Sequence, residues 1–245
     1  MSLALPRRAS AEFAGTALLV AAVVGSGIAA ARLSPADVGL QLLENAIATA
    51  LALGALILTF GPLSGAHFNP VVSAVDWWLG RRAGTGLTAR DLAAYTAAQV
   101  GGAITGAVLA DLMFGLPAVS WSQTDRTGGN LWLAEVVATA GLVVLVFALA
   151  RSGRTSAAPA AVGAYIGAAY WFTSSTSFAN PAVTIGRAFT DTFAGITPTS
   201  VPGFIAAQLV GGLVAVAALA AWYPHAGDAA DAVVVPHLNR ETEAR

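Results

Sequence analysis

The stretch SSTSFANPAVTIGRAFTD, residues 174–191, decides the fold, because residues 64–77, SGAHFNPVVSAVDW, echo its pattern. Each stretch places Asn-Pro directly after a run of small or polar residues. Each continues with an amphipathic segment that is too short to cross a bilayer. Asn at an N-cap with Pro at the first helical position is a helix-start signature. We therefore predict two short helices, which begin at Asn69 and Asn180.

The composition of the 245-residue chain is typical of an integral membrane protein. The chain is 56% hydrophobic and only 10% charged, and its mean hydropathy is +0.70. A soluble protein has about 25% charged residues, so most of this surface cannot face water. The chain has no Cys, which excludes cysteine-based metal or nucleophile chemistry. All twelve basic residues are Arg and the net charge is −1, so nothing indicates a nucleic-acid partner.

Six apolar segments are predicted to span the membrane, since about 20 apolar residues cross its hydrocarbon core. The segments are 13–31, 46–63, 92–110, 131–150, 157–172 and 203–222. We expect the first to be retained, because it is long for a signal peptide and has no convincing cleavage site. In the third, Gly102 and Gly106 have the small-xxx-small spacing that permits close helix packing. The polar tail, 224–245, is assigned no structure.

The two halves of the chain, about 11–113 and 131–223, repeat one another within a single membrane domain that covers residues 1–245. AEFAGTALLV resembles AEVVATAGLVV, and AQVGG resembles AQLVGG. Each half has three predicted spans and one short helix. An odd number of spans turns the second half upside down, as in an inverted repeat. We therefore expect the two short helices to enter from opposite faces, with their N-termini meeting near the midplane.

The distribution of Arg predicts the orientation, because basic residues are in excess on the cytoplasmic side of a membrane. With the predicted spans, seven Arg fall on one side and three on the other. The seven are Arg7, Arg8, Arg81, Arg82, Arg90, Arg151 and Arg154, and the three are Arg32, Arg126 and Arg187. The N-terminus, the tail and the first short helix are therefore predicted to be cytoplasmic.

Two helix starts that meet inside a membrane predict a pore for uncharged polar solutes. Each Asn carbonyl is expected to cap backbone donors, which leaves its NH2 group free to donate into the gap. The residues before each Asn are predicted to be extended, with carbonyls that form a ladder of acceptors along the pore. These residues are Gly65, Ala66, His67, Thr176, Ser177 and Phe178. Two positive helix ends and two Asn donors would repel cations.

With these motifs, the chain resembles the aquaporin and aquaglyceroporin (major intrinsic protein) family from about Glu12 to Trp222. The family's two Asn-Pro-Ala loops are matched by Asn69, Pro70 and Val71, where Val replaces Ala, and by Asn180, Pro181 and Ala182. The resemblance implies an all-α membrane fold of six spans and two re-entrant half-helices. It also implies a passive channel rather than an enzyme, with no cofactor or metal.

The same resemblance implies a homotetramer in the cell membrane, with one pore in each subunit and lipid, water and small neutral solutes as its partners. The family's paired buried Glu residues are matched by Glu12 and Glu135. Both are implied to hold the Asn loops by hydrogen bonds.

The chain departs from the family at the outer constriction of the pore. Where the family usually has Arg, three residues after the second Asn, this chain has Val183. Counting from the motifs places the other constriction residues at Thr49, Ala168 and Ser177, all of them small. We therefore expect a wide, weakly selective constriction. Arg187 lies one helical turn farther along, and we expect that it does not replace the missing Arg.

The stretch TSSTSFANPAVTIGR, with Val183, is similar to the bacterial aquaglyceroporin branch that is associated with arsenic resistance. This resemblance implies that glycerol-like polyols, arsenous acid or other metalloids, organic arsenicals and water are the solutes. Arsenous acid resembles a small polyol, with hydroxyls that can bond to a ladder of carbonyls.

Two other functions stay open: a water-selective aquaporin, and a coupled secondary transporter of a small neutral solute. Coupling would need a titratable group near the solute, and the candidates are Glu12 and Glu135. Their matching positions in the two halves favour a structural role. We also expect His67 to support its loop, and Gln99 and Gln208 to join helices. Asp76 and Arg187 are predicted to form local pairs or to lie on the surface.

Overall fold

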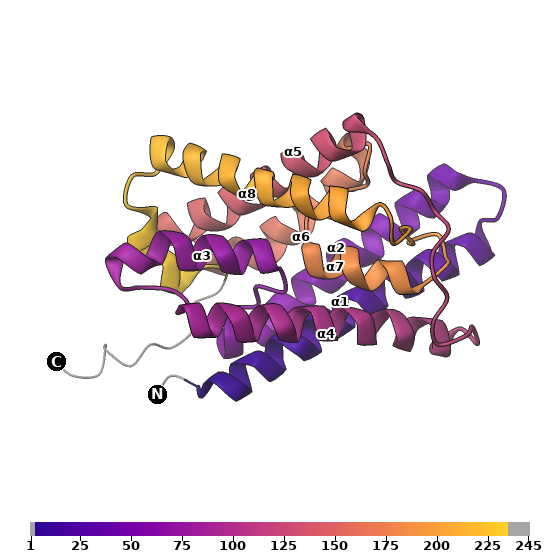
Figure 1. Ribbon diagram of the computed structural model, residues 1–245, viewed down its shortest axis with the longest axis horizontal. Helices are drawn as coiled ribbons and strands as arrows, with labels where there is room; N and C mark the ends of the chain where they lie inside the picture. The colour runs from indigo at the N-terminus through magenta and orange to yellow at the C-terminus, as the bar shows by residue number, and fades with distance from the viewer. Residues whose placement is uncertain (1–2, 235–245) are drawn as a thin grey trace.

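The computed structural model describes residues 3–234, and these residues fold into a bundle of helices that run along its long axis (Figure 1). Five helices are long and apolar enough to cross a membrane. They are α1 (Leu5–Leu33), α2 (Val38–Ser64), α4 (Ala89–Met113), α5 (Gly129–Arg151) and α8 (Val201–Trp222). The remaining predicted span is the shorter α6 (Ala158–Phe172), which follows the 3-10 turn η1 (Thr155–Ala157).

The two short helices begin at the predicted positions. α3 (Pro70–Ala83) has Asn69 as its N-cap, and α7 (Pro181–Gly186) has Asn180. α3 continues beyond the predicted end near Leu79 and stops at Gly84, whose left-handed conformation is a common helix C-terminus. α7 is extended by one 3-10 turn, η2 (Arg187–Phe189).

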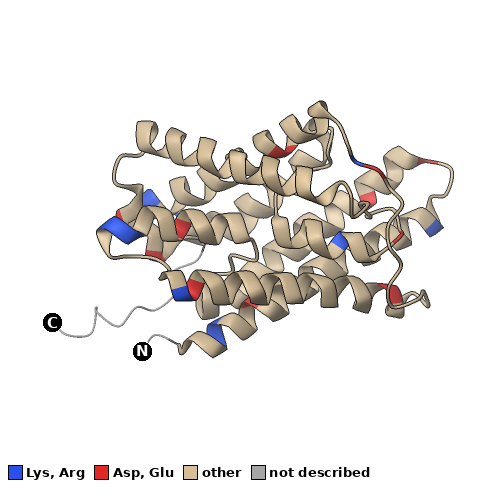
Figure 2. Ribbon diagram, in the orientation of Figure 1, with Lys and Arg blue, Asp and Glu red and all other residues tan. Residues whose placement is uncertain are grey.

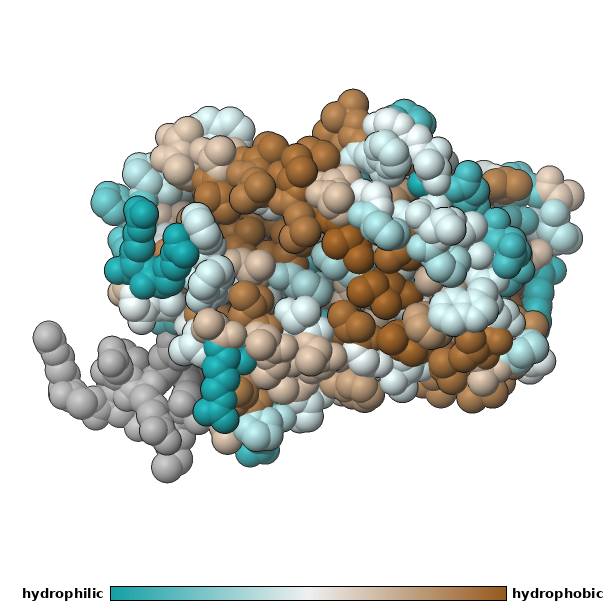
Figure 3. Space-filling view, viewed as in Figure 1, coloured by the Kyte–Doolittle hydropathy of each residue, from teal (hydrophilic) through white to brown (hydrophobic). Residues whose placement is uncertain are grey.

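The two halves share their main helix contact, because α1 packs on α4 as α5 packs on α8. In the first half α1 also packs extensively on α2, whereas α5 contacts α6 much less, and α2 lies against α6. Charged residues lie mainly toward the ends of the bundle (Figure 2), and large apolar areas cover the surface between them (Figure 3). This arrangement suits a molecule whose middle contacts lipid and whose ends contact water.

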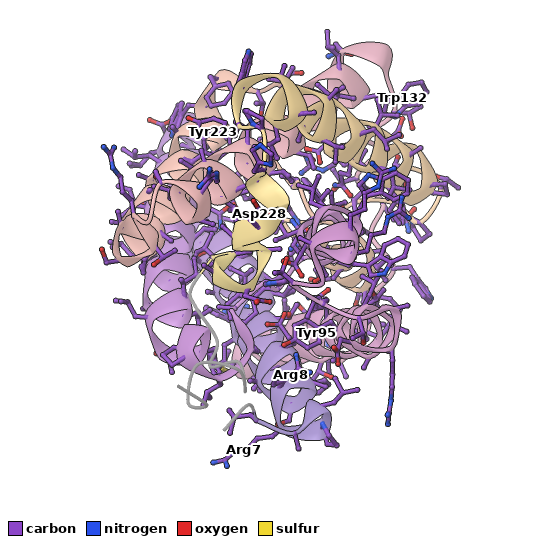
Figure 4. All side chains as sticks on the ribbon, turned by 90° about the vertical axis from the view of Figure 1, so that its left-hand side faces the viewer. Arg7, Arg8, Tyr95, Trp132, Tyr223 and Asp228 are labelled. Carbon is purple, nitrogen blue, oxygen red and sulfur yellow. The ribbon has the colours of Figure 1, made fainter. Side chains whose placement is uncertain are left out.

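Part of the tail has structure, so the prediction of an unstructured tail is wrong for residues 226–234. The 3-10 segment η3 (Ala226–Ala232) packs against α3 and α5, and Val233 and Val234 are buried. The end-on view shows η3, with Asp228, lying across the bundle (Figure 4). The apolar residues after Asp231 allow this burial. Residues 235–245 of the tail lie outside the described part of the chain.

Close contact between α1 and α4 depends on Gly102 and Gly106. A Cβ at Gly102 would overlap the carbonyl oxygen of Phe13, and a Cβ at Gly106 would overlap that of Ala17. The two helices therefore meet backbone to backbone at these positions, as the small-xxx-small spacing predicts.

We expect Gly102→Ala to lower the free energy of unfolding by about 1–3 kcal/mol, the usual cost of overpacking. Gly101→Ala is the matched control, because its Cβ would lie 3.6 Å from the Phe13 ring, an ordinary contact. Both changes gain the helix propensity of Ala, so the difference between their free energies of unfolding measures the cost of the overlap between the Cβ at position 102 and the carbonyl oxygen of Phe13. Thermal unfolding in detergent measures it, and equal melting temperatures for the two variants would contradict the backbone contact.

Candidate functional site

Glu12, on α1, holds the loop that precedes the first short helix. Its Oε1 accepts hydrogen bonds from Ser64 Oγ (2.5 Å) and from the backbone N–H of His67 (3.0 Å). Its Oε2 accepts from the backbone N–H of Phe68 (2.7 Å) and from Gln99 Nε2 (2.8 Å). The carboxylate is fully buried, so these four donors replace the water that an ionised group would otherwise require.

Glu135, on α5, holds the second loop through the same set of bonds. Its Oε1 accepts from Ser175 Oγ (2.7 Å) and from the backbone N–H of Phe178 (2.9 Å). Its Oε2 accepts from the backbone N–H of Ala179 (2.8 Å) and from Gln208 Nε2 (2.7 Å). Both Glu residues therefore lie where the family resemblance places them, each bonded to the loop before its own Asn.

Gln99 and Gln208 connect these carboxylates to the short helices. Gln99 Nε2 also donates to Ser73 Oγ on α3 (3.1 Å), and Gln208 Nε2 donates to Thr184 Oγ1 on α7 (2.9 Å). His67 supports its own loop through Nδ1, which lies 3.0 Å from Ser73 Oγ. The structure thus places all three side chains in supporting contacts between elements.

The loops before the two Asn residues are not extended, and that prediction is wrong. Three residues in each loop have positive φ, namely Gly65, Ala66 and Phe68 in the first and Thr176, Ser177 and Ala179 in the second. This geometry lets consecutive N–H groups reach a single carboxylate, as in the anion-binding nests that such alternation forms. The left-handed conformation costs a non-glycine residue of order 1 kcal/mol, and the carboxylate bonds offset that cost.

Each Asn caps its own short helix. Asn69 Oδ1 accepts from the N–H of Val71 at 2.9 Å. Asn180 Oδ1 accepts from the N–H groups of Ala182 at 3.0 Å and Val183 at 3.2 Å. The carbonyl ends of both amides are therefore directed at the helix starts, as capping requires.

The NH2 group of each Asn reaches across to the other half of the chain. Asn69 Nδ2 donates to the carbonyl of Ala179, and Asn180 Nδ2 donates to the carbonyl of Phe68, both at 2.7 Å. The expectation that each NH2 group is free to donate into the gap is therefore wrong for one of its two N–H bonds, which is taken by the opposite loop. These reciprocal bonds fix the distance between the two helix starts.

A cavity of about 60 Å³ passes both Asn residues. Its wall is mainly apolar, with side chains such as Leu53, Ile57, Leu142, Val146 and Val162. The predicted site residues that line it are Thr49, Ala66, His67, Asn69, Ser177, Phe178, Asn180 and Val183. The predicted site residues that do not line it are Glu12, Gly65, Pro70, Val71, Glu135, Ala168, Thr176, Pro181 and Ala182.

The prediction of Ala168 as a constriction residue is wrong. Ala168 is exposed on the outer side of α6, whereas Val162, Ile166 and Tyr170 line the cavity. The buried Tyr170 hydroxyl lies 3.2 Å from Thr49 Oγ1. Counting twelve residues back from Asn180 assumed the family's usual spacing at this loop. The four-residue period of the cavity-facing side chains is the signal that finds Tyr170 instead.

Arg187 also lies differently from its prediction as a local pair or surface group. It is 2% exposed and lines the same cavity as Val183. Residues four apart share one face of a helix, and this spacing directs both side chains toward the cavity. Its Nε donates to the carbonyl of Ala194, and its guanidinium carbon lies 3.4 Å from the ring centre of Phe178. Asp76, predicted in the same way, is buried as well.

Asp125 lies in the connection between α4 and α5, outside the spans. Its Oδ1 accepts from Thr127 Oγ1 (2.6 Å) and Ser200 Oγ (3.0 Å). These bonds lower the pKa of the Asp125 carboxyl, with Thr127 the main cause. The carboxylate is therefore ionised at neutral pH and helps to fix this connection to the start of α8.

Comparison with known proteins agrees with this geometry. The family model described as "Major intrinsic protein" matches residues 1–177. The chain belongs to the major intrinsic protein family. Members of this family are membrane channels rather than enzymes, so the chain is a multi-pass membrane channel.

Relatives within the major intrinsic protein family cover most of the chain. Aquaglyceroporin AqpS of Rhizobium meliloti (strain 1021) is 55% identical over 213 residues, which are 87% of this chain and 88% of that protein. Aquaporin Z of Brucella melitensis biotype 1 is 32% identical over 167 residues, 63% of this chain and 70% of that protein. The crystal structure of the Plasmodium falciparum aquaglyceroporin matches with a TM-score of 0.63 and 20% identity, covering 90% of this chain and 97% of that chain. That structural likeness establishes the fold.

We expect Glu135→Ala to lower the free energy of unfolding by about 1–3 kcal/mol, because the buried loop N–H groups lose their acceptor. Glu135→Gln should lose less, since one oxygen remains to accept. The control is Glu44→Gln, which affects a partly exposed carboxylate that accepts a hydrogen bond from Ser34 Oγ. Folded yield and the melting temperature in detergent are the measurements, and wild-type values for Glu135→Ala would show that the loop does not depend on the carboxylate.

Proposed function

We propose that this channel conducts glycerol-like polyols, arsenous acid and related neutral metalloids, and water, through a wide constriction. The main support is the cavity that passes both Asn residues, because no Asp or Glu of residues 3–234 lines it. Isolated polar groups on an apolar wall suit solutes that carry hydroxyls but no charge.

Several polar groups are available to such a solute. The buried Ser177 hydroxyl has no hydrogen-bond partner among the described residues and lines the cavity. The hydroxyls of Thr49 and Tyr170 face the same space. Asn69 and Asn180 each have a second amide N–H beyond the one bonded to the opposite loop. A polyol can exchange water for these groups while its CH groups contact the apolar wall.

Small side chains support a wide constriction. Thr49, Ser177 and Val183 are small, and the position that usually carries the family's Arg is Val183. Tyr170 also lines the cavity, and its hydroxyl adds a hydrogen-bonding group beside Thr49. Glycerol fits the name of the relative called aquaglyceroporin AqpS. Arsenous acid and organic arsenicals follow from the resemblance of the Val183 stretch to the arsenic-resistance branch.

The alternatives have less support. In a coupled transporter, a titratable group would face the solute, but Glu12 and Glu135 each accept four hydrogen bonds from the scaffold. In a water-selective aquaporin, large side chains would close the ring, whereas three of the side chains here are small.

We further propose a homotetramer with one pore in each subunit, located in the cell membrane with both termini in the cytoplasm. The basic residues lie mainly at the end of the bundle that carries the start of α1 and η3 (Figure 2), which supports this orientation. Large apolar side chains such as Leu51, Leu58 and Leu213 are exposed on the helices, where lipid or a neighbouring subunit would cover them.

We expect proteoliposomes to show fast flux of glycerol and arsenous acid with modest flux of water, a low activation energy and no saturation at millimolar solute. Stopped-flow light scattering on one preparation measures the fluxes of glycerol, arsenous acid and water. Empty vesicles are the control. Saturation together with dependence on a pH gradient would instead indicate a coupled transporter, and fast water with both solutes excluded would indicate a water-selective aquaporin.

Val183→Arg is expected to reduce glycerol flux about tenfold and water flux by less, because the long side chain narrows the ring. Val183→Ala is the matched control, since it alters the same position without narrowing it and should retain glycerol flux. Equal loss of glycerol and water flux in Val183→Arg would show that residue 183 does not set the width of the constriction.

A further inference from the structure

Arg187 is a buried cation that faces the cavity without a counterion. No carboxylate of residues 3–234 lies within ion-pair distance of it, and its Nε donates to the neutral carbonyl of Ala194. A charged group inside a membrane protein is costly and is commonly retained for function.

A second arginine, Arg126, contacts the same aromatic ring as Arg187, that of Phe178. The guanidinium carbon of Arg187 is 3.4 Å from the Phe178 ring centre, and that of Arg126 is 5.1 Å from it. Arg126 Nε donates to another backbone carbonyl, that of Gly195, at 2.8 Å. We call Arg126, Phe178 and Arg187 the guanidinium collar. Both cations are within the distance at which an aromatic face attracts them.

The collar is fixed by the surrounding structure. The N–H of Phe178 is bonded to Glu135, and its ring packs on Phe204 with the centres 5.0 Å apart. The connection between α4 and α5 crosses this end of the bundle near α7 (Figure 1). The N–H of Ser122 donates to the carbonyl of Ala188 at 3.1 Å. Of the three collar residues, Phe178 and Arg187 line the cavity, and Arg126 lies behind Phe178 without lining it.

Neither Glu135 nor Asp125 neutralises the collar by contact. Glu135 directs its oxygens to four scaffold donors. Asp125, adjacent to Arg126 in the chain, accepts from Thr127 and Ser200. Neither makes an ion pair with an arginine within the described range. The end of the cavity beside Val183 therefore carries positive charge that is partly desolvated, where charge acts most strongly.

We propose that the guanidinium collar, through Arg187 above all, excludes cations from this channel in place of the arginine that the family usually carries at the position of Val183. The inference rests on the proposed channel function and adds its charge selectivity. A neutral solute passes the collar without electrostatic cost, whereas a cation of the same size is repelled. Because the small side chains set the width of the constriction and Arg187 supplies the charge, the constriction can be wide and still exclude cations.

Urea and guanidinium test the proposal, because they are both small and planar and differ by one positive charge. In proteoliposomes, the wild type should admit urea and exclude guanidinium. Arg187→Gln should raise guanidinium permeability about tenfold and leave urea flux within about twofold. Arg187→Lys retains the charge and should still exclude guanidinium. Arg126→Gln should give a smaller increase.

Arg32→Gln is the matched control. Arg32 has the same kind of contacts, since it donates to the carbonyl of Phe114 (2.9 Å) and lies 5.3 Å from that ring centre, but it does not line the cavity. It should leave guanidinium excluded.

Each other outcome is decisive. Guanidinium flux through the wild type at the rate of urea would overturn the collar without any variant, even if Arg187→Gln fails to fold. Folded Arg187→Gln that still excludes guanidinium would also overturn it, as would an equal leak through Arg187→Lys and Arg187→Gln. If the wild type conducts neither urea nor glycerol above empty vesicles, the proposed function itself fails, and the collar proposal fails with it.

Discussion

The structure depends on two buried carboxylates that each accept four hydrogen bonds, two of them from backbone N–H groups of an irregular loop. Without Glu12 and Glu135, the backbone N–H groups before each Asn would lie inside the membrane without an acceptor, which is unfavourable because no water there can replace it. The bonds allow the loops to adopt left-handed residues and to stop midway across the bundle. The close packing of α1 on α4 brings Gln99 to Glu12, and the packing of α5 on α8 brings Gln208 to Glu135.

The same hydrogen bonds hold the polar groups of the cavity, the amides of Asn69 and Asn180, in fixed positions. The Asn amides are held at one end by the helix starts and at the other by a carbonyl of the opposite loop. Solute therefore passes groups that are already in place and do not need to reorganise. The apolar wall around them limits the hydrogen bonds on offer, which favours small neutral molecules over ions.

The sequence predicted the features that follow from local chemistry. Asn-Pro identifies both helix starts, and the repeat identifies the paired Glu and Gln residues, because their roles depend on short-range capping and matching positions. It did not predict Tyr170, because a count carried over from the family misses a change in loop length, whereas the period of α6 finds the cavity face. The prediction for Arg187 was wrong because its distance from Val183 along the short helix suggested that it lies away from the cavity. Residues four apart share one face of a helix, so Arg187 lines the cavity together with Val183. The left-handed loop residues and the buried Val234 arise from contacts between distant segments, which no local pattern encodes.

The reciprocal bonds between the Asn residues also bear on biosynthesis. The N–H of Asn69 finds its acceptor at Ala179, 110 residues later in the chain, and Asn180 completes the pair by bonding back to Phe68, 112 residues earlier. A ribosome must therefore finish most of the protein before the centre of the cavity can close. Until then, the first loop has its own carboxylate but lacks its cross-membrane partner. In the nascent chain, the first loop can therefore bond to Glu12, but its hydrogen bonds to the second loop form only after the second half has been made.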